Sequence, residues 1–353
     1  MNYTQILKRA WTILWSYRAL WIFGMLVALT SAPNGGNNGN GVQYQLSPKD
    51  SLFTPPAELR SQFDRFNDLI RQWSNQETGT VIAIILAFVG AVLLLAILFT
   101  ILRYISQVAL IRMVDRYEGS GEKLTFRQGF RLGWSRPAWR LFLVNLVIFL
   151  PLALVLIALF GCAALPVLLG SMAGGVPTWA GIVATIGLGF LVIFLAILVG
   201  VALSLVTEMI YRVVVFQETG VVESIRLGIQ TVRRSLKDVF VVWLILVGIQ
   251  LGFFVILIPV VLVFGGVALL VGGGLGISVY FLAQAISSQV AGWVSGAIVG
   301  ISLFLLVFLL PLLFMGGLKE TYLSTVWTLT YRELSRSAAL SLPVQADAPA
   351  SES

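Results

Sequence analysis

Glu208 and Arg212 are the ionisable residues placed where chemistry would matter most, because they directly follow a charge-free apolar segment that ends at Thr207. A charge held in hydrocarbon is costly, so an ionisable residue at such a position is a candidate for moving ions or protons. The acid precedes the base by four residues, which is also the favourable order for a pair on one helix face. We expect an interfacial ion pair at a helix end. The alternative is that Glu208 is a coupling carboxylate for proton-driven transport.

Asn145 and Gln250 are polar residues inside apolar segments. Amide side chains in such segments hydrogen-bond to neighbouring helices and so help to hold a bundle together. Amides are also suited to lining a substrate path through a membrane. We predict packing contacts for both residues and keep them as candidate pore-lining residues.

Small residues recur at spacings of four in two apolar segments, where they would let two helices approach to backbone contact. They are Ser288, Gly292, Gly296 and Gly300 in one segment and Gly248 and Gly252 in the other. The sequence predicts close helix packing at these positions. The partner is either another helix of the same chain or a second copy of the protein.

Residue types that most catalytic and metal sites need are scarce. There is no histidine, which excludes imidazole bases and histidine metal ligands. The one cysteine, Cys162, lies in an apolar run, so the chain has neither a disulfide framework nor a thiolate cluster. No phosphate-binding loop, no GxSxG motif and no acidic cluster with metal spacing occurs. We expect no enzyme activity and no cofactor or metal.

The elements that must position these residues are membrane helices. Charged residues make up 11% of the 353 residues, against roughly 25% in soluble domains, and the mean hydropathy is +0.93. A helix needs about 20 apolar residues to cross the hydrocarbon core. The sequence predicts an all-α polytopic membrane protein with a single membrane domain over residues 1–336. Six spans are expected, near 12–32, 79–102, 141–169, 180–206, 239–270 and 292–316.

Two glycine-containing breaks divide the longest apolar stretches. Gly174 to Pro177 separates the third span from the fourth, and Gly272 to Gly276 separates the fifth from the sixth. The connection 271–291 carries no charge. Whether it forms a re-entrant loop is left open.

The distribution of Lys and Arg predicts the orientation of the chain. Segment 103–140 holds eight basic and three acidic residues, and segment 208–238 holds five basic and four acidic residues. The connections 170–180 and 271–291 carry no charge. The sequence therefore predicts that both termini and the two basic loops are cytoplasmic, an N-in/C-in topology.

The segments outside the spans have distinct compositions. Residues 1–32 also fit a cleaved signal peptide, but Arg18 interrupts the apolar run, so we favour a retained first span. Residues 33–78 are expected to form an extracytoplasmic loop with an amphipathic helix over 56–76. Residues 337–353 are rich in Ala, Ser and Pro and are predicted to be a disordered cytoplasmic tail.

A weak internal repeat places a basic segment directly before several spans. Phe126 to Phe130 (FRQGF) aligns with Ile225 to Ile229 (IRLGI), and the N-terminus resembles a third copy. Such segments suit amphipathic helices that lie in the headgroup region, where each Lys or Arg is worth roughly 1 kcal/mol near an anionic leaflet. The predicted headgroup contacts are Arg127, Arg131, Arg136, Arg226, Arg233, Arg234 and Lys237.

These segments, Phe126 to Arg140 and Ile225 to Lys237, are similar to those of an uncharacterised bacterial multi-pass family. That family resembles the membrane region associated with glycerophosphoryl diester phosphodiesterases. The opening stretches Ile6 to Trp11 and Tyr17 to Gly24 are also similar to the start of that group. The resemblance implies a location in the bacterial cytoplasmic membrane. The metal-binding acids and histidines of the phosphodiesterase have no counterpart here, so the resemblance implies no such activity.

Three functional classes follow from these observations. The leading hypothesis is a non-catalytic accessory or scaffold protein that interacts with lipid. Its partners would be anionic headgroups on the cytoplasmic side, together with a protein partner or further copies of itself, and no nucleic acid. The alternative is a permease or exporter of a small amphiphilic molecule. An intramembrane enzyme is the least supported class, because lipid chemistry generally needs acids, histidine or metal ligands.

Overall fold

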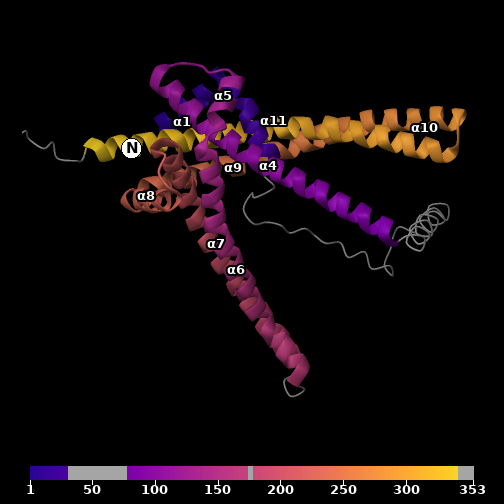
Figure 1. Cartoon of the computed structure of the whole chain (residues 1–353), viewed down its shortest axis with the longest axis horizontal. Helices are drawn as coiled ribbons and strands as arrows, with labels where there is room; N and C mark the ends of the chain where they lie inside the picture. The colour runs from indigo at the N-terminus through magenta and orange to yellow at the C-terminus, as the bar shows by residue number, and fades with distance from the viewer. Residues whose placement is uncertain (31–77, 174–177, 341–353) are drawn as a thin grey trace, which may run out of the picture. The chain divides into compact units, whose positions relative to one another are not determined.

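The computed structural model describes residues 1–30, 78–173 and 178–340, and these residues form helices without a strand (Figure 1). The expectation of an all-α chain is confirmed. The helices are α1 (Tyr3–Ser16), α2 (Ala19–Thr30), α4 (Thr78–Ser120), α5 (Phe126–Gly133), α6 (Arg136–Ala173), α7 (Thr178–Gln217), α8 (Val221–Arg234), α9 (Leu236–Ala268), the π-helical turn η1 (Leu269–Gly273), α10 (Gly274–Ile286) and α11 (Gln289–Leu340).

Five described segments are long and apolar enough to cross a membrane, so the chain is a membrane protein. They are Leu86–Ser120, Arg136–Leu168, Trp179–Gln217, Leu236–Ile286 and Ala291–Ser337. Helices α1 and α2 would count as a sixth span only if taken together, and they are bent by 100° at the break between them. The count of six and the N-in/C-in orientation stay predictions.

The residues divide by their contacts into two compact units, which we describe separately. One comprises Met1–Ala32 and Leu102–Ser353, and the other Pro33–Ile101. Within the second unit the structure describes residues 78–101, the first part of α4, whose apolar side chains are largely exposed. The predicted loop and its helix over 56–76 lie outside the described residues.

Three helices continue well past the predicted ends of their spans. The spans predicted to end near residues 102, 206 and 316 are parts of helices that run to Ser120, Gln217 and Leu340. Charged side chains do not by themselves end a helix, and here one face of each extension is apolar and buried. Much of the expected basic loops is therefore helical, as are the first four residues of the expected tail.

The predicted break at Gly272 to Gly276 is wrong. The chain passes through this segment as η1 and α10 and reverses only after Ile286, at residues 287–288. The backbone of Gly273 is helical, with φ −65° and ψ −48°. Gly272 and Gly276 fit a helix because they pack against α11, and the chain forms a helical hairpin within the connection 271–291.

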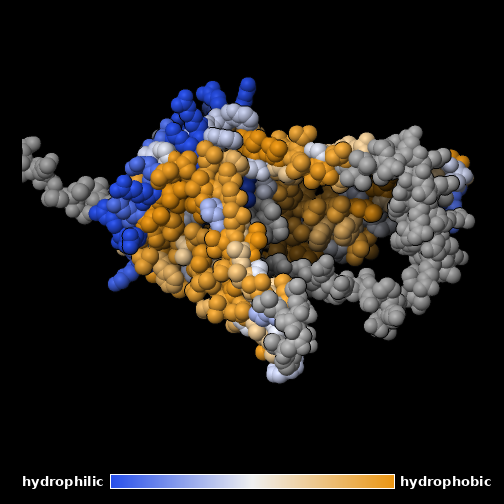
Figure 2. All heavy atoms as spheres, turned by 60° about the horizontal axis from the view of Figure 1, so that its bottom comes forward, coloured by the Kyte–Doolittle hydropathy of each residue, from blue (hydrophilic) through white to orange (hydrophobic). Residues whose placement is uncertain are grey.

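The core of the first unit forms where the extensions of α4, α7 and α11 meet the short helices. Fully buried residues come from all of these parts, among them Ile13, Leu110, Ile210 and Val326. Beyond this core, α6 pairs with α7 and α10 with α11 (Figure 1), and most of their apolar side chains are exposed. Figure 2 shows hydrophilic side chains gathered on the side where Figure 1 labels α1, α5 and α8, with hydrophobic side chains over the helices that lead away.

Candidate functional site

A polar seam runs through the core along the extensions of α4, α7 and α11. We use this name for the buried or half-buried polar side chains of residues 103–115, 207–212 and 317–332. Each extension carries one arginine in a similar place, namely Arg112, Arg212 and Arg332. The seam is the candidate functional site, because buried polar groups need partners and their arrangement is therefore specific.

Arg212 is the most buried charged residue of the seam, with 2% of its surface exposed. One guanidinium nitrogen, Nη1, donates to the carboxylate of Glu208 and to the Glu208 carbonyl oxygen, the latter at 2.7 Å. Nη2 donates to the carbonyl oxygen of Ser324 on α11 at 3.4 Å. The structure thus contains the pair expected from the i, i+4 spacing. It places the arginine inside the protein core rather than at an exposed helix end.

Arg112 links α4 to the end of α7 and to the bend between α5 and α6. Its Nη2 lies 2.5 Å from Oε1 of Glu218, which directly follows α7. Its Nη1 donates to the Leu132 carbonyl oxygen and to Ser135 Oγ, each at 3.4 Å. Arg112 therefore holds the end of α7 and the bend between α5 and α6 against α4.

Arg332 joins α11 to α4 in a contact that the sequence analysis missed. Its Nη1 donates to the side-chain carboxylate of Asp115 and to the Asp115 carbonyl oxygen, the latter at 2.9 Å. A sequence signal was present, because Tyr331-Arg332 repeats Tyr211-Arg212.

The hydroxyl groups of the seam are of two kinds. Buried threonines of α11 bond to their own helix, as in the 2.8 Å hydrogen bond from Thr321 Oγ1 to the Gly317 carbonyl oxygen. Other buried polar atoms have no hydrogen-bond partner among the described residues. They include Ser106 Oγ, Thr207 Oγ1, Ser324 Oγ and Arg212 Nε. An unsatisfied buried polar group costs about 1–3 kcal/mol, so these atoms mark the part of the core with unused hydrogen-bonding capacity.

Asn145 and Gln250, the candidate pore-lining residues, lie in different environments. The Asn145 amide nitrogen donates to the hydroxyl oxygens of Tyr104 and Tyr211, each at 2.6 Å. It therefore connects α6 to both α4 and α7, as expected of a packing contact. Gln250 is exposed on α9. The structure does not bring the two residues together.

The glycine row of α11 packs against the hairpin partner within the same chain. A Cβ atom on Gly296 would lie 2.8 Å from the Gly276 carbonyl oxygen, and one on Gly300 would lie 3.0 Å from the Gly272 carbonyl oxygen. Gly292 is similarly close to Tyr280 of α10, at 2.9 Å from its carbonyl oxygen. These residues thus show the close packing that the spacing predicted, and the partner is the same chain.

The other predicted packing residues behave differently. Gly248 and Gly252 on α9 face open space, with no described neighbouring atom within 4 Å of a Cβ placed there, so no described helix of this chain packs on them and their packing role stays a prediction. The spacing of four puts both on one face, but the fold leaves that face uncovered. Ser288 lies in the turn before α11, where its Oγ accepts a 3.2 Å hydrogen bond from the Ala291 N–H. Ser288 therefore caps the helix rather than packing between helices.

The seven predicted headgroup residues all lie on the exposed faces of α5 and α8 or at the starts of α6 and α9. None of the seven forms an ion pair with another described residue. The opposite faces pack through glycine, since Gly129 lies against Met113 of α4 and Gly228 against Ile210 of α7. Trp134 and Trp139 beside α5 are also exposed, at 64% and 62%.

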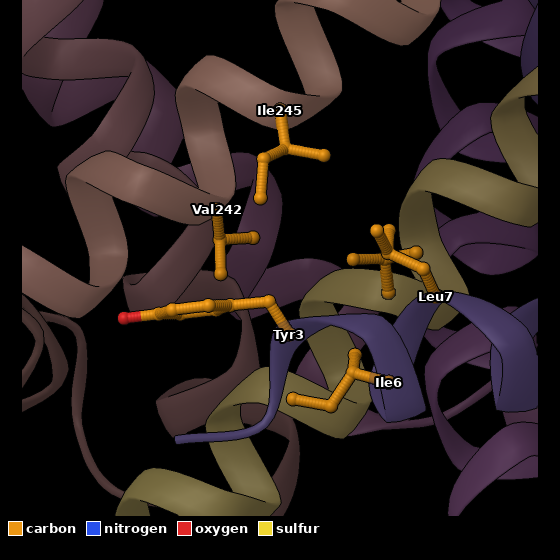
Figure 3. Close-up of a pocket in the computed structure, with 6 residues that line it drawn as sticks. Tyr3, Ile6, Leu7, Val242 and Ile245 are labelled. Atoms are coloured by element: carbon orange, nitrogen blue, oxygen red, sulfur yellow. The ribbon is translucent and has the colours of Figure 1, made fainter.

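Helix α1 covers a small apolar pocket together with α9 and α11. The lining residues are Tyr3, Ile6, Leu7, Val242, Ile245 and Val326, and Figure 3 shows the Tyr3 ring beneath Val242 of α9. The Tyr3 hydroxyl donates to Asp238 Oδ1 at 2.5 Å. This hydrogen bond to a carboxylate raises the pKa of the Tyr3 phenol above its ordinary value of 10.0, because it stabilises the protonated phenol.

A second, open groove lies beside the contact between Arg332 and Asp115. It is lined by Asp115, Arg116, Gly119, Ser120, Glu122 and Arg332. Both charge signs are present in the lining. Among the described residues, no group of three or more His, Cys, Asp or Glu side chains is arranged to hold a metal ion.

Comparison with known proteins places the chain in a family. Residues 8–334 match the Family of unknown function (DUF7544), so the chain belongs to this family. No curated protein and no solved structure matches it. The expectation of an uncharacterised family is confirmed, and nothing in the match links the chain to the membrane region associated with glycerophosphoryl diester phosphodiesterases.

Proposed function

We propose that this member of the DUF7544 family is a non-catalytic scaffold of the bacterial cytoplasmic membrane that binds anionic lipid headgroups through α5 and α8. One contrast carries the proposal. Three of the four seam arginines, Arg112, Arg212 and Arg332, have a carboxylate partner, whereas the seven predicted headgroup residues are exposed and have none among the described residues.

The exposed basic residues lie where a bilayer would meet the protein. Arg136 and Lys237 stand at or next to the first residue of α6 and α9, two helices long and apolar enough to cross a membrane. Lys and Arg at such positions attract anionic headgroups, and tryptophan favours the same depth. Trp134 and Trp139 flank Arg136 and supply that residue type. These features support lipid binding on the side predicted to be cytoplasmic.

The test is the amount of anionic lipid retained after mild extraction, measured by mass spectrometry. The variant Arg127→Gln/Arg131→Gln removes two unpaired cations from α5. At roughly 1 kcal/mol for each cation, its affinity for phosphatidylglycerol should fall about thirtyfold. The matched control is Arg9→Gln/Lys319→Gln, which removes two cations that already pair with Glu118 and Glu320. Equal retention by both double variants would contradict the proposal.

A permease for a small amphiphile is the second candidate, and the unpaired polar atoms of the seam favour it. Arg212 Nε, Thr207 Oγ1 and Ser324 Oγ are buried without described partners. Thr207 and Arg212 lie close in sequence to the half-buried Glu208, and the Ser324 carbonyl oxygen accepts from Arg212. Such groups could bind a polar solute during a transport cycle. If Glu208→Gln in folded protein abolished uptake or release of a co-purified metabolite by vesicles, transport would replace the scaffold proposal.

A further inference from the structure

Three repeats of one structural plan make up the described chain. The first contains α1, α2 and α4, the second α5, α6 and α7, and the third α8, α9 with η1 and α10, and α11. Each begins with a short helix, continues into a helix that leads away, and ends with a helix whose last part carries Arg112, Arg212 or Arg332. The second and third repeats each lead out and back, because α6 pairs with α7 and α10 pairs with α11.

The short helices occupy equivalent positions in a cyclic order. Helix α5 packs on α4 of the preceding repeat through Gly129, and α8 packs on α7 through Gly228. Helix α1 packs on α11, the last helix of the third repeat, where the rings of Trp11 and Tyr322 lie 6.2 Å apart. The small buried residue of α1 that corresponds to the two glycines is Ala10. The first and last repeats therefore meet as the others do.

The three arginines follow the same order. Arg112 of the first repeat reaches Glu218 at the end of the second, and Arg212 of the second reaches Ser324 of the third. Arg332 of the third reaches Asp115 of the first. Each arginine thus contacts the next repeat, and the third contact closes a ring.

We infer that α1 is a strap that closes this ring and can lift from it, whereas α5 and α8 stay in place. The reason is connectivity. Five residues, 121–125, join α4 to α5, and three residues, 218–220, join α7 to α8, so these helices are tethered to the helices on which they pack. In a linear chain the corresponding link from α11 to α1 does not exist. Only non-covalent contacts hold α1 against α11.

A small pocket and an open groove lie at this third junction. The apolar pocket lies between α1 and helices α9 and α11, and the open groove lies between the end of α4 and Arg332. Both therefore separate the first repeat from the third. The side chains of Tyr3 and Arg9 form two polar contacts, to Asp238 and, at 2.6 Å, to Glu118. The end of α1 is also held, because Lys123 Nζ donates to the Ser16 carbonyl oxygen at 2.9 Å.

The bend after α1 supplies the hinge, because α2 is held independently of α1. A Cβ on Gly317 would lie 2.7 Å from the Met25 backbone nitrogen, so α2 and α11 are in backbone contact. Thr321 Oγ1 also lies within hydrogen-bonding distance of the Leu20 carbonyl oxygen, at 3.2 Å. The 100° bend separates this fixed helix from the strap.

The test compares two buried positions that correspond in the repeats, Leu14 in α1 and Val232 in α8, which are 3% and 4% exposed. Each is changed to cysteine in a Cys162→Ser background, because Cys162 is exposed. The full chain in lipid nanodiscs is treated with a water-soluble maleimide, and rates are divided by those of the same variant in denaturing detergent. Leu14→Cys should react at least about tenfold faster than Val232→Cys, as expected for local opening at one helix.

Removing the two polar contacts should free the strap further. Adding Tyr3→Phe and Arg9→Gln should accelerate the labelling of Leu14→Cys and leave that of Val232→Cys unchanged. Equal rates at the two positions, or acceleration at both, would overturn the inference. Hydrogen exchange of the unsubstituted chain gives a check that needs no variant, since amides of residues 7–16 should exchange faster than those of 225–234.

A reversible disulfide distinguishes lifting of α1 from separation of the whole first repeat. A Cβ on Gly316 would lie 3.3 Å from the Ala28 Cβ, close to the spacing that a disulfide bridges. Oxidation of an Ala28→Cys/Gly316→Cys pair fixes α2 to α11. Labelling at position 14 should remain fast after oxidation, and a fall to the rate at position 232 would contradict a strap that moves alone.

Discussion

The polar seam and the basic faces of α5 and α8 use the same residue type in opposite ways. In the seam, Arg212 is 2% exposed and bound to Glu208, whereas Arg226 and Arg233 on α8 are exposed without a described carboxylate partner. A buried arginine must be paired, because leaving its charge uncompensated is costly. An exposed arginine gains little from a partner in water and stays available for a ligand. The comparison separates residues that fix the fold from residues that can bind.

The largest expected effect comes from Glu208→Ala, which leaves Arg212 buried with a lost partner. Breaking a buried pair in this way typically costs about 3–5 kcal/mol, and the partial exposure of Glu208 places the expectation near the lower end, at about 3 kcal/mol. The free energy of unfolding in mixed micelles measures it. The control Glu223→Ala removes an exposed acid of α8 and should change stability by less than about 0.5 kcal/mol. A similar loss in both variants would break the comparison.

Gly296 of α11 and Gly252 of α9 form a second matched pair, because one packs against a backbone and the other faces open space. Gly296→Val would force side-chain atoms into the Gly276 backbone and should destabilise the α10–α11 hairpin by about 2 kcal/mol through overpacking. Gly252→Ala faces open space within a helix and should be neutral or stabilise by up to about 1 kcal/mol. Thermal unfolding of the two variants in one detergent tests both signs. Equal destabilisation would mean that the face of α9 around Gly252 is covered after all.

Asn145 and Gln250 extend the comparison between packed and exposed residues to uncharged side chains. Asn145→Ala removes two hydrogen bonds to tyrosine hydroxyls and should cost about 1 kcal/mol, within the range found between membrane helices. Gln250→Ala should leave the free energy of unfolding unchanged, because the side chain is exposed. Loss of a transport activity without loss of stability in the Asn145 variant would instead favour a pore-lining role.

A small effect on stability is also expected for Arg233→Gln/Arg234→Gln. Both residues are exposed on the last turn of α8, so unfolding should shift by less than about 0.5 kcal/mol. Binding to vesicles that contain phosphatidylglycerol should nevertheless weaken. A stability loss comparable to that of Glu208→Ala would show that the basic face belongs to the fold and would undercut its assignment to lipid.

Several features of the chain could be predicted locally. The long charge-free runs indicate membrane helices whatever their partners, since crossing length and hydropathy are properties of each segment. In FRQGF and IRLGI the arginine stands two residues before the glycine. This spacing likewise indicates one exposed face and one packed face, as α5 and α8 show. The spacing of Glu208 and Arg212 was enough to predict their pair, because both residues lie on one helix.

Tertiary contacts determined which of the residues that share a sequence pattern are packed or buried and which are exposed. Gly296 and Gly252 follow similar spacing rules, but only Gly296 meets another backbone, because the chain reverses at residues 287–288 rather than at the glycines before it. Arg212 is buried because α11, more than 100 residues later, places Ser324 against it. Arg332 gained its role from Asp115 in the same way. Sequence alone determined which segments are apolar and long enough to cross a membrane, whereas the ends of the helices, burial and pairing depend on contacts between distant segments, which no local pattern contains.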